Sequence, residues 1–214
     1  MAPSAQSGPK PPVHFSSSLT IAELAVLTGA HHISIHSESV IHPRARLDSL
    51  AGRVTIGRRC VVHERAMIGG SASSGLTSAR SSVASPGVLS PTAAVAGSGG
   101  EASQSATPQS VTLGDYVTVE VGATIEAGGT AVGDGTVVGV GARVGAGAVV
   151  GKHCTLTPQS VVSPGEVVPD FTVVLANGMR RTDRRGMTEL KNKGLARQIE
   201  VLRRLISSKP AKFA

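Results

Sequence analysis

Histidine is the residue type in this 214-residue chain best suited to chemistry. A neutral imidazole can bind zinc or accept a proton near neutral pH. Three imidazoles that converge on one zinc ion leave its fourth position open for an activated water molecule. A single imidazole in a cleft can instead act as the general base of a group transfer. The choice depends on how the chain brings together its histidines, which are His14, His31, His32, His36, His42, His63 and His153.

The elements that must position these side chains come from a repeat of six residues. In the second half of the chain every sixth residue is aliphatic, at Val132, Val138, Val144, Val150, Leu156, Val162, Val168 and Val174. Glycine directly follows the first four of them, and the fourth residue after each is often small, as at Ala142 and Cys154. Neither an α-helix nor an alternating strand needs a period of six. A chain that turns a corner every six residues does.

This repeat predicts an all-β fold, a left-handed parallel β-helix. Three segments would close one triangular coil, and successive coils would stack at the strand spacing of about 4.8 Å. The eight aliphatic residues would then fill the interior as structural core. The number of repeats along the chain predicts about six coils. The strands at the two ends of such a stack lack partners, which makes the ends candidate interaction surfaces.

The repeat also sets the expected domain boundaries. The β-helix is predicted for residues 19–182, after a lead-in at 1–18 that is rich in Pro, Ser and Gly and that we expect to be disordered. The pattern vanishes in the Ser-rich and Gly-rich stretch 71–110, which predicts a flexible loop. The alternative for this stretch is an active-site flap or an arm that clasps a neighbour.

After Gly178 the period becomes helical. Apolar residues at steps of three to five predict an amphipathic α-helix at 183–207, followed by a short tail at 208–214. Its apolar face either packs on a flat side of the β-helix or contacts a partner protein. The residues of this face are Met187, Leu190, Leu195, Ile199, Leu202 and Ile206.

Composition excludes several other classes of protein. The net charge is +7, but the excess of Lys and Arg lies after residue 180 and has no aromatic residues beside it, which argues against nucleic-acid binding. Cys60 and Cys154 occupy small-residue positions of the repeat, so we expect buried thiols. The chain shows no signal-peptide pattern and no apolar run long enough to span a membrane, so a cytoplasmic location is expected.

The spacing of the histidines argues against zinc. His31 and His36 have a plausible spacing, but no third ligand lies where a γ-class carbonic anhydrase would need one. His36 and His42 are one hexapeptide apart, which places them on different faces. We therefore expect no metal and no other cofactor. For acyl transfer, His63 and His153 are the candidate general bases, although the spacing places no acidic partner beside either of them.

Several segments resemble the dynactin subunit 6 family of hexapeptide-repeat β-helix proteins. The resemblance covers roughly residues 21–206 without the Ser-rich stretch. The segments that carry it are Ile41-His42-Pro43-Arg44-Ala45-Arg46-Leu47, Arg53-Val54-Thr55-Ile56-Gly57, Val62-His63-Glu64-Arg65-Ala66-Met67-Ile68, Glu120-Val121-Gly122 and Val168-Pro169-Asp170-Phe171-Thr172-Val173-Val174, with Gly178 and Arg180-Arg181 after them.

The resemblance implies a structural subunit without catalytic activity. It would belong to the pointed-end complex of dynactin, pair with the β-helix protein dynactin subunit 5 and other pointed-end subunits, and support dynein-dependent movement along microtubules and cargo binding. It implies a cytoplasmic, cytoskeleton-associated location and a heteromeric assembly rather than a homotrimer. The alternatives are a homotrimeric hexapeptide-repeat acyltransferase, with its sites between subunits, or an enzyme similar to the γ-class carbonic anhydrases.

Overall fold

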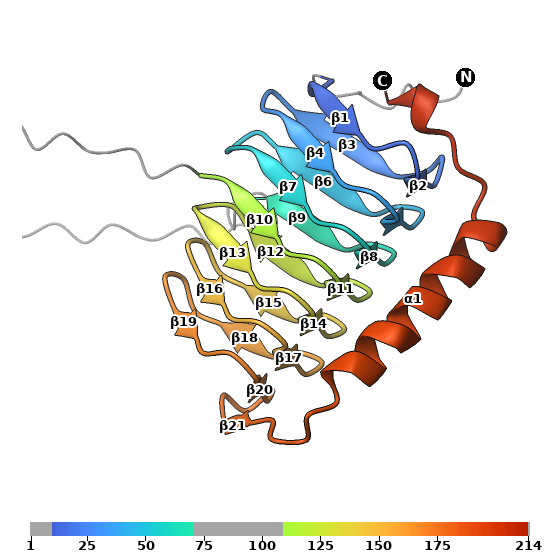
Figure 1. Ribbon diagram of the computed structural model, residues 1–214. Helices are drawn as coiled ribbons and strands as arrows, with labels where there is room; N and C mark the ends of the chain where they lie inside the picture. Colours follow the sequence, from blue (N-terminus) through green and yellow to red (C-terminus); the bar gives the residue numbers. More distant parts are fainter. Residues whose placement is uncertain (1–9, 71–108, 214) are drawn as a thin grey trace, which may run out of the picture.

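Three parallel sheets form the sides of a left-handed β-helix in the computed structural model, which describes residues 10–70 and 109–213 (Figure 1). Each coil contributes one short strand to each sheet, so strands three apart in the sequence pair with each other. Sheet C has six strands, one from each complete coil, and β19 and β20 begin a seventh coil. The fold class predicted from the period of six is confirmed.

The strands of each sheet follow one another along the prism. Sheet A contains β1 (Val13–Phe15), β4 (Ile33–Ile35), β7 (Val54–Ile56), β10 (Val111–Leu113), β13 (Thr130–Val132), β16 (Val149–Val150) and β19 (Val167–Val168). Sheet B contains β2 (Thr20–Ile21), β5 (Val40–Ile41), β8 (Val61–Val62), β11 (Thr118–Val119), β14 (Val137–Val138), β17 (Thr155–Leu156), β20 (Thr172–Val174) and β21 (Arg180–Thr182). Sheet C contains β3 (Val26–Gly29), β6 (Arg46–Ser49), β9 (Met67–Gly70), β12 (Thr124–Glu126), β15 (Arg143–Val144) and β18 (Val161–Val162).

The core is a set of aliphatic columns inside the prism. In sheet A, Val132 pairs in register with Val150, which pairs with Val168. All eight aliphatic residues of the repeat between positions 132 and 174 are at most 2% exposed. Burying one such side chain stabilises the fold by roughly 1.5–3 kcal/mol, so the columns supply most of the driving force.

Between the sheets the chain turns through four-residue corners. We call the turn from sheet A to sheet B the AB corner and the turn from sheet B to sheet C the BC corner. The third residue of each turn takes a left-handed backbone conformation, as Arg59 does at the AB corner (φ 54°) and Arg65 at the BC corner (φ 57°). Glycine takes the same conformation at Gly141, without the cost that a side chain carries there. At each corner the side chains of successive coils therefore form a column, in which neighbouring side chains are one coil apart.

The structure departs from the expected boundaries at the N-terminus. Strand β1 lies within the stretch predicted as a disordered lead-in, and it pairs with β4 through Val13 with Ile33 and Phe15 with Ile35. Val13 and Phe15 alternate with a polar residue, and that alternation forms a strand once a neighbouring coil offers an edge. The predicted loop at 71–110 falls between β9 and β10, and its residues 71–108 lie outside the described residues.

Helix α1 (Thr188–Leu205) runs back along the outer face of sheet B (Figure 1). Its one fully buried residue, Ile199, packs against Val40 and Val61. The residues of the predicted apolar face divide into two groups. Four of them, Leu195, Ile199, Leu202 and Ile206, pack on sheet B. The other two, Met187 and Leu190, are exposed. No helix in the described ranges is long and apolar enough to cross a bilayer.

The C-terminal segment closes the first coil. After α1, Ser208 forms a β-bridge with Ala22, and its hydroxyl accepts a hydrogen bond from the Ile21 N–H at 3.1 Å. The short 3₁₀-helix η2 (Pro210–Lys212) then places Phe213 against the core, where it is 8% exposed. At the other end, β21 pairs antiparallel with β20 and covers the edge of sheet B. Both additions satisfy strand edges that would otherwise be bare.

Replacing Phe213 with Ala is expected to lower the free energy of unfolding by about 3 kcal/mol, because it removes a buried aromatic side chain from the end of the core. Urea unfolding followed by circular dichroism measures the change. Ala211→Ser is the control, since this residue of the same short helix is exposed and should leave the midpoint nearly unchanged. Equal midpoints for Phe213→Ala and wild type would show that the cap contributes nothing to stability.

Candidate functional site

Two histidines meet at the BC corner. His42 directly follows β5 and His63 directly follows β8, and these strands are neighbours in sheet B. The two side chains therefore occupy the same position in consecutive coils. Their rings stack with centroids 4.6 Å apart and an interplanar angle of 30°. Stacking at the coil spacing buries part of each imidazole and holds both in a fixed orientation.

Both imidazoles are held in the neutral form. Burial lowers the pKa of His42 below its ordinary value of 6.5, the charge of His63 lowers it further, and Glu64 opposes the shift. Burial also lowers the pKa of His63, while Glu120 and Glu64 raise it in part. Desolvation disfavours a charged imidazole, and a second cation in the stack would be repelled by the first. A neutral imidazole at neutral pH is the form that can accept a proton.

The ring nitrogen Nε2 of His42 is buried and has no hydrogen-bond partner among the described residues. Buried polar atoms nearly always find a partner, so an atom left without one calls for an explanation. A ligand group that donates a hydrogen bond at this corner would supply it. Together with the stacked imidazoles, the unsatisfied nitrogen makes the BC corner the candidate functional site.

An acidic side chain continues the column into the next coil. Glu120 directly follows β11, the strand beside β8, and so takes the position that the two histidines take in their coils. One of its carboxylate oxygens accepts a hydrogen bond from the Val140 N–H at 3.1 Å. The remaining charge acts on His63 through space. The expectation that no acidic partner lies near His63 is therefore wrong, because the coil brings together residues far apart in sequence.

Two arginines lie in the same turns. Arg44 and Arg65 occupy the left-handed third position of the two corners that carry the histidines, with φ of 61° and 57°. Both side chains are exposed, and neither forms an ion pair with any residue in the part of the chain that the structure describes. Glu64, which directly precedes Arg65, is also exposed, so the turn carries charges of both signs. The two guanidinium groups are the part of the corner that suits a ligand with a negative group.

The sequence analysis missed the pairing of His42 with His63. A regular coil of three hexapeptides is 18 residues long, whereas Val40 pairs with Val61, a separation of 21. The extra residues lie where the repeat loses its phase, so counting by six separates two residues that are neighbours in space. One signal was available: each histidine directly follows a pair of aliphatic residues that ends at a core position, Ile41 or Val62.

The remaining histidines lie elsewhere. His153, the second candidate base, sits at the AB corner and stacks on Phe171 with centroids 5.3 Å apart. His31 donates a ring N–H to the Ser49 carbonyl at 2.8 Å, and the His14 and His32 rings lie 6.4 Å apart. Within residues 10–70 and 109–213, no three His, Cys, Asp or Glu side chains converge to hold a metal ion.

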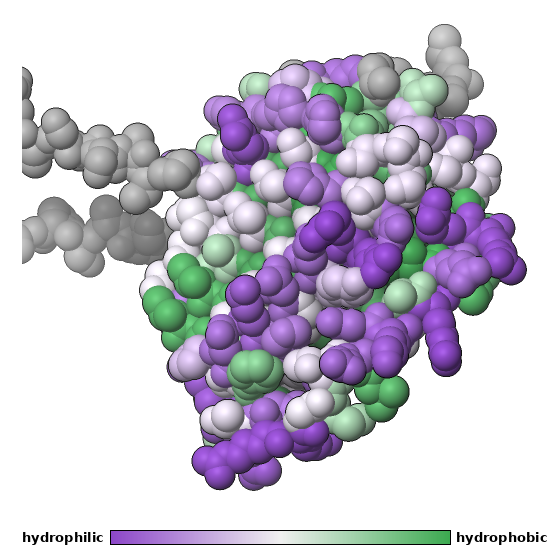
Figure 2. All heavy atoms as spheres, viewed as in Figure 1, coloured by the Kyte–Doolittle hydropathy of each residue, from purple (hydrophilic) through white to green (hydrophobic). Residues whose placement is uncertain are grey.

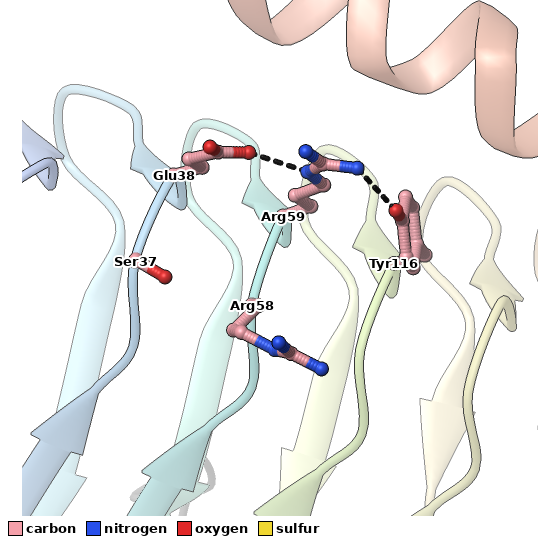
Figure 3. Close-up of a pocket in the computed structure, with 5 residues that line it drawn as sticks. All are labelled: Ser37, Glu38, Arg58, Arg59 and Tyr116. Atoms are coloured by element: carbon pink, nitrogen blue, oxygen red, sulfur yellow. Dashed lines mark hydrogen bonds and ion pairs between the residues drawn. The ribbon is translucent and has the colours of Figure 1, made fainter.

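A cavity at the AB corner is the main competing site. It has a volume of about 210 Å³ and is lined by Ser37, Glu38, Arg58, Arg59 and Tyr116, which come from three successive coils (Figure 3). Arg59 donates one hydrogen bond to Glu38 and another to the Tyr116 hydroxyl. Arg58 donates to Asp115 at 2.8 Å. These charged groups pair with one another across neighbouring coils, so their main contribution is to hold the coils together.

The two cysteines are unsuited to nucleophilic chemistry. Both are buried, as the repeat predicts, and burial raises the pKa of the Cys60 thiol to about 12 and also raises that of Cys154. The thiols donate to the carbonyls of Gly114 and Pro169, each at 3.1 Å. A thiol that stays protonated at neutral pH is a poor nucleophile.

Stability is expected to fall as the pH drops below 6.5. The folded state holds His42 and His63 at lowered pKa values, so the unfolded chain binds more protons between those values and 6.5. The stabilisation is complete above 6.5 and is lost as the pH falls through the folded-state pKa values. Urea unfolding of wild type and of His42→Gln/His63→Gln at several pH values isolates the effect. If the free energy of unfolding changes with pH to the same extent in the two proteins, the prediction is contradicted.

The fold recurs in solved bacterial structures. A hexapeptide transferase family protein from Anaplasma phagocytophilum superimposes with a TM-score of 0.64 at 15% identity over 91% of each chain. A candidate acetyltransferase from Bacillus cereus superimposes with a TM-score of 0.63 at 18% identity, over 91% of this chain and 92% of the other. No protein-family model matches the sequence, and no curated protein does either. At these identities the likeness shows the shared fold.

These comparisons correct the resemblance drawn from the sequence. The similar structures are bacterial hexapeptide proteins named as transferases, and nothing found supports a dynactin subunit. The residues that carried the resemblance include Ile41, Leu47, Ile56 and Val62, which are core positions that the geometry of any hexapeptide coil requires. The expectations of a non-catalytic subunit and of a role in dynein transport depended on that resemblance and are wrong. The pairing with dynactin subunit 5 stays a prediction that these comparisons do not test. What this chain shares with these solved structures is the left-handed β-helix fold.

Proposed function

We propose that this protein is an acyltransferase that moves an acyl group from a thioester donor to a hydroxyl or amine acceptor at the BC corner. The observation that carries the proposal is the stacked pair of neutral imidazoles, His42 and His63, with an unpartnered buried nitrogen. A base kept neutral by burial is what deprotonation of an alcohol or ammonium group requires near neutral pH.

His63 is the general base in this proposal. Its ring is half-buried, so a substrate can reach it from solvent while His42 covers one face. The imidazole takes the acceptor proton as the acceptor oxygen or nitrogen bonds to the thioester carbonyl carbon. The tetrahedral intermediate then expels the thiolate, which takes the proton back from the imidazolium. The ester or amide, the free thiol and the neutral base remain.

Glu120 stabilises the charge that forms during this cycle. When His63 carries the proton it becomes an imidazolium, and the Glu120 carboxylate already raises the pKa of that ring. A carboxylate near an imidazole favours its protonated form without becoming protonated itself. The hydrogen bond that it accepts from the Val140 N–H fixes its position along the column. Glu120 is thus a positioning and charge-stabilising residue.

Arg44 and Arg65 supply a positive surface beside the base. Thioester donors of the coenzyme A type carry phosphate groups, and guanidinium groups bind phosphate through several N–H donors at once. A donor bound across these turns would place its phosphates at the arginines and its thioester near His63. The names of the two similar structures, a transferase family and a candidate acetyltransferase, also favour an acyl group as small as acetyl.

A second copy of the chain would complete the site. The BC corner lies on an outer edge of the prism, and the His63 side chain there is partly exposed. Catalysis of acyl transfer benefits from a cleft that orients both substrates and limits water. A neighbouring protomer packed against the corner provides that second wall. We therefore propose a homo-oligomer, as in the trimeric acyltransferase alternative.

The test is an assay of thiol release. The full-length protein is incubated with acetyl coenzyme A and a panel of amine and hydroxyl acceptors, and free thiol is measured with a chromogenic disulfide. Thiol release that depends on both an acceptor and the protein supports the proposal. Mass spectrometry then shows whether the acetyl group has been transferred to the acceptor. Absence of acceptor-dependent release from acetyl, succinyl and longer acyl donors would overturn it.

A further inference from the structure

Helix α1 carries a second apolar stripe that faces away from the β-helix. Leu190, Val201 and Leu205 are 61%, 56% and 74% exposed, although each lies on the same helix as the buried Ile199. Spacings of eleven and four residues place the three on one line along the helix axis, and Met187 extends the line by one turn. Figure 2 shows apolar side chains among charged ones over the part of the surface where α1 runs.

The stripe has the shape that a second helix fits. Gly194 and Arg197 lie on the same line between Leu190 and Val201, and a Cβ atom built at Gly194 would meet nothing within 4 Å. The stripe therefore has a notch between Leu190 and Arg197, which a side chain from a partner helix can enter. At its N-terminal end Met187, Leu190 and Lys193 line a hollow of about 360 Å³. Glycine in the middle of a helix costs about 1 kcal/mol relative to Ala, so its presence here calls for a packing reason.

One edge of the stripe is basic. Lys193 and Arg204 lie along that edge, and Arg197 lies on the stripe itself beside them, while Glu189 and Glu200 lie farther round on the same side. Arg204 pairs with Glu200 at 2.7 Å, whereas Lys193 and Arg197 form no ion pair with any residue of the described ranges. A helix laid on the stripe would bring its own flanking residues against this row. Charge complementarity then requires acidic side chains on the partner.

We propose that the outward face of α1 docks an amphipathic helix of another protein, with aliphatic residues along its seam and Asp or Glu along one edge. A second copy of α1 fits poorly, because α1 has five basic and two acidic side chains and would oppose its own charge. A membrane surface fits poorly as well, because α1 contains no aromatic residue and Gly194 interrupts the stripe. The inference does not depend on the proposed acyl transfer.

The probe is a synthetic peptide of about three heptads with Leu at the seam positions and Glu at the flanking positions. A second peptide has Lys in place of every Glu. Binding to the full-length protein is measured by fluorescence anisotropy at low and high salt. We expect the acidic peptide to bind, its affinity to fall as salt rises, and the basic peptide to bind at least tenfold more weakly.

The variant Leu190→Ser/Val201→Ser/Leu205→Ser should weaken binding of the acidic peptide on the order of a hundredfold, because three apolar contacts are lost. Its matched control is Leu50→Ser/Val161→Ser/Val167→Ser, which removes three equally exposed aliphatic side chains from the β-helix and should bind like wild type. Gly194→Ala should bind about fivefold more weakly. Because this change favours the helix, weaker binding cannot be attributed to loss of fold.

Several outcomes would overturn the proposal. Equal binding of the acidic and basic peptides would remove the charge argument, and equal binding by the stripe variant would remove the surface. Sedimentation of wild type, but not of the stripe variant, as a larger oligomer would assign the stripe to a second copy. Co-flotation with phosphatidylcholine vesicles that contain phosphatidylserine, lost in the stripe variant, would assign it to a membrane.

Discussion

Replacing Val144 with Asp is expected to unfold the β-helix. Val144 lies on β15 with its side chain fully buried, and it pairs in register with Ile125 on one side and Val162 on the other. A carboxylate in this column would lie among the aliphatic side chains of the core. Burying such a group costs several kcal/mol, and a domain of this size is stable by about 5–15 kcal/mol in total. The folded population should therefore collapse.

Thermal unfolding followed by circular dichroism at neutral pH measures the effect. Val161→Asp is the matched control, because Val161 lies on the adjacent strand β18 with its side chain 55% exposed, and it introduces the same charge on the outside of the same sheet. We expect the control to melt close to wild type. A Val144→Asp protein with an unchanged melting temperature would mean that the position does not face the interior.

The residues that fill the interior of the prism could be predicted because they depend only on the six-residue repeat of the sequence. A period of six without interruption fixes which residues point inward at every corner, whatever the corners themselves do. For that reason the eight positions from Val132 to Val174 can be read from the chain as one set, and the structure places all of them in the core. The same logic places Cys60 and Cys154 beside the core.

The candidate site could not be predicted, because it depends on sums of coil lengths. His42 and His63 meet only if the coil between them contains 21 residues, and the extra residues follow Leu47, where the repeat gives no register. Glu120 lies next in the same column, although the stretch 71–108 separates it from His63 in the sequence. A period identifies faces, but the length of each irregular corner decides which residues of a face are neighbours.

The cap at the first coil was missed for a related reason. Phe213 belongs to the core, and its segment reaches the first coil through Ser208 and Ala22, although nearly the whole chain separates these residues. A contact of this kind has no period, and a single aromatic residue in a short polar tail gives no signal of burial. Similarly, the helical pattern of α1 predicts which residues are apolar but does not say which of two apolar stripes faces sheet B.

Replacing His63 with Gln should abolish most of the proposed acyl transfer. Glutamine keeps a polar side chain of similar size and cannot accept a proton, so the acceptor loses its base. Removing a general base lowers the rate by about 10²–10⁴-fold. The measurement is kcat/KM for thiol release from acetyl coenzyme A. His153→Gln serves as the control, since His153 stacks on Phe171 at the AB corner and should retain the wild-type rate.

The pH profile separates a catalytic role for His63 from a structural one. Because burial lowers its pKa below 6.5, the acidic limb of the rate profile, where the ring becomes protonated, should have its midpoint below pH 6.5. Glu120 raises the pKa of His63, so Glu120→Gln should lower that pKa further and move the acidic limb of the profile to lower pH. A merely structural Glu120 would change the rate at every pH by the same factor. If His63→Gln transfers acyl groups as fast as wild type, or if Glu120→Gln leaves the limb in place, the base lies elsewhere and the BC corner loses its assignment.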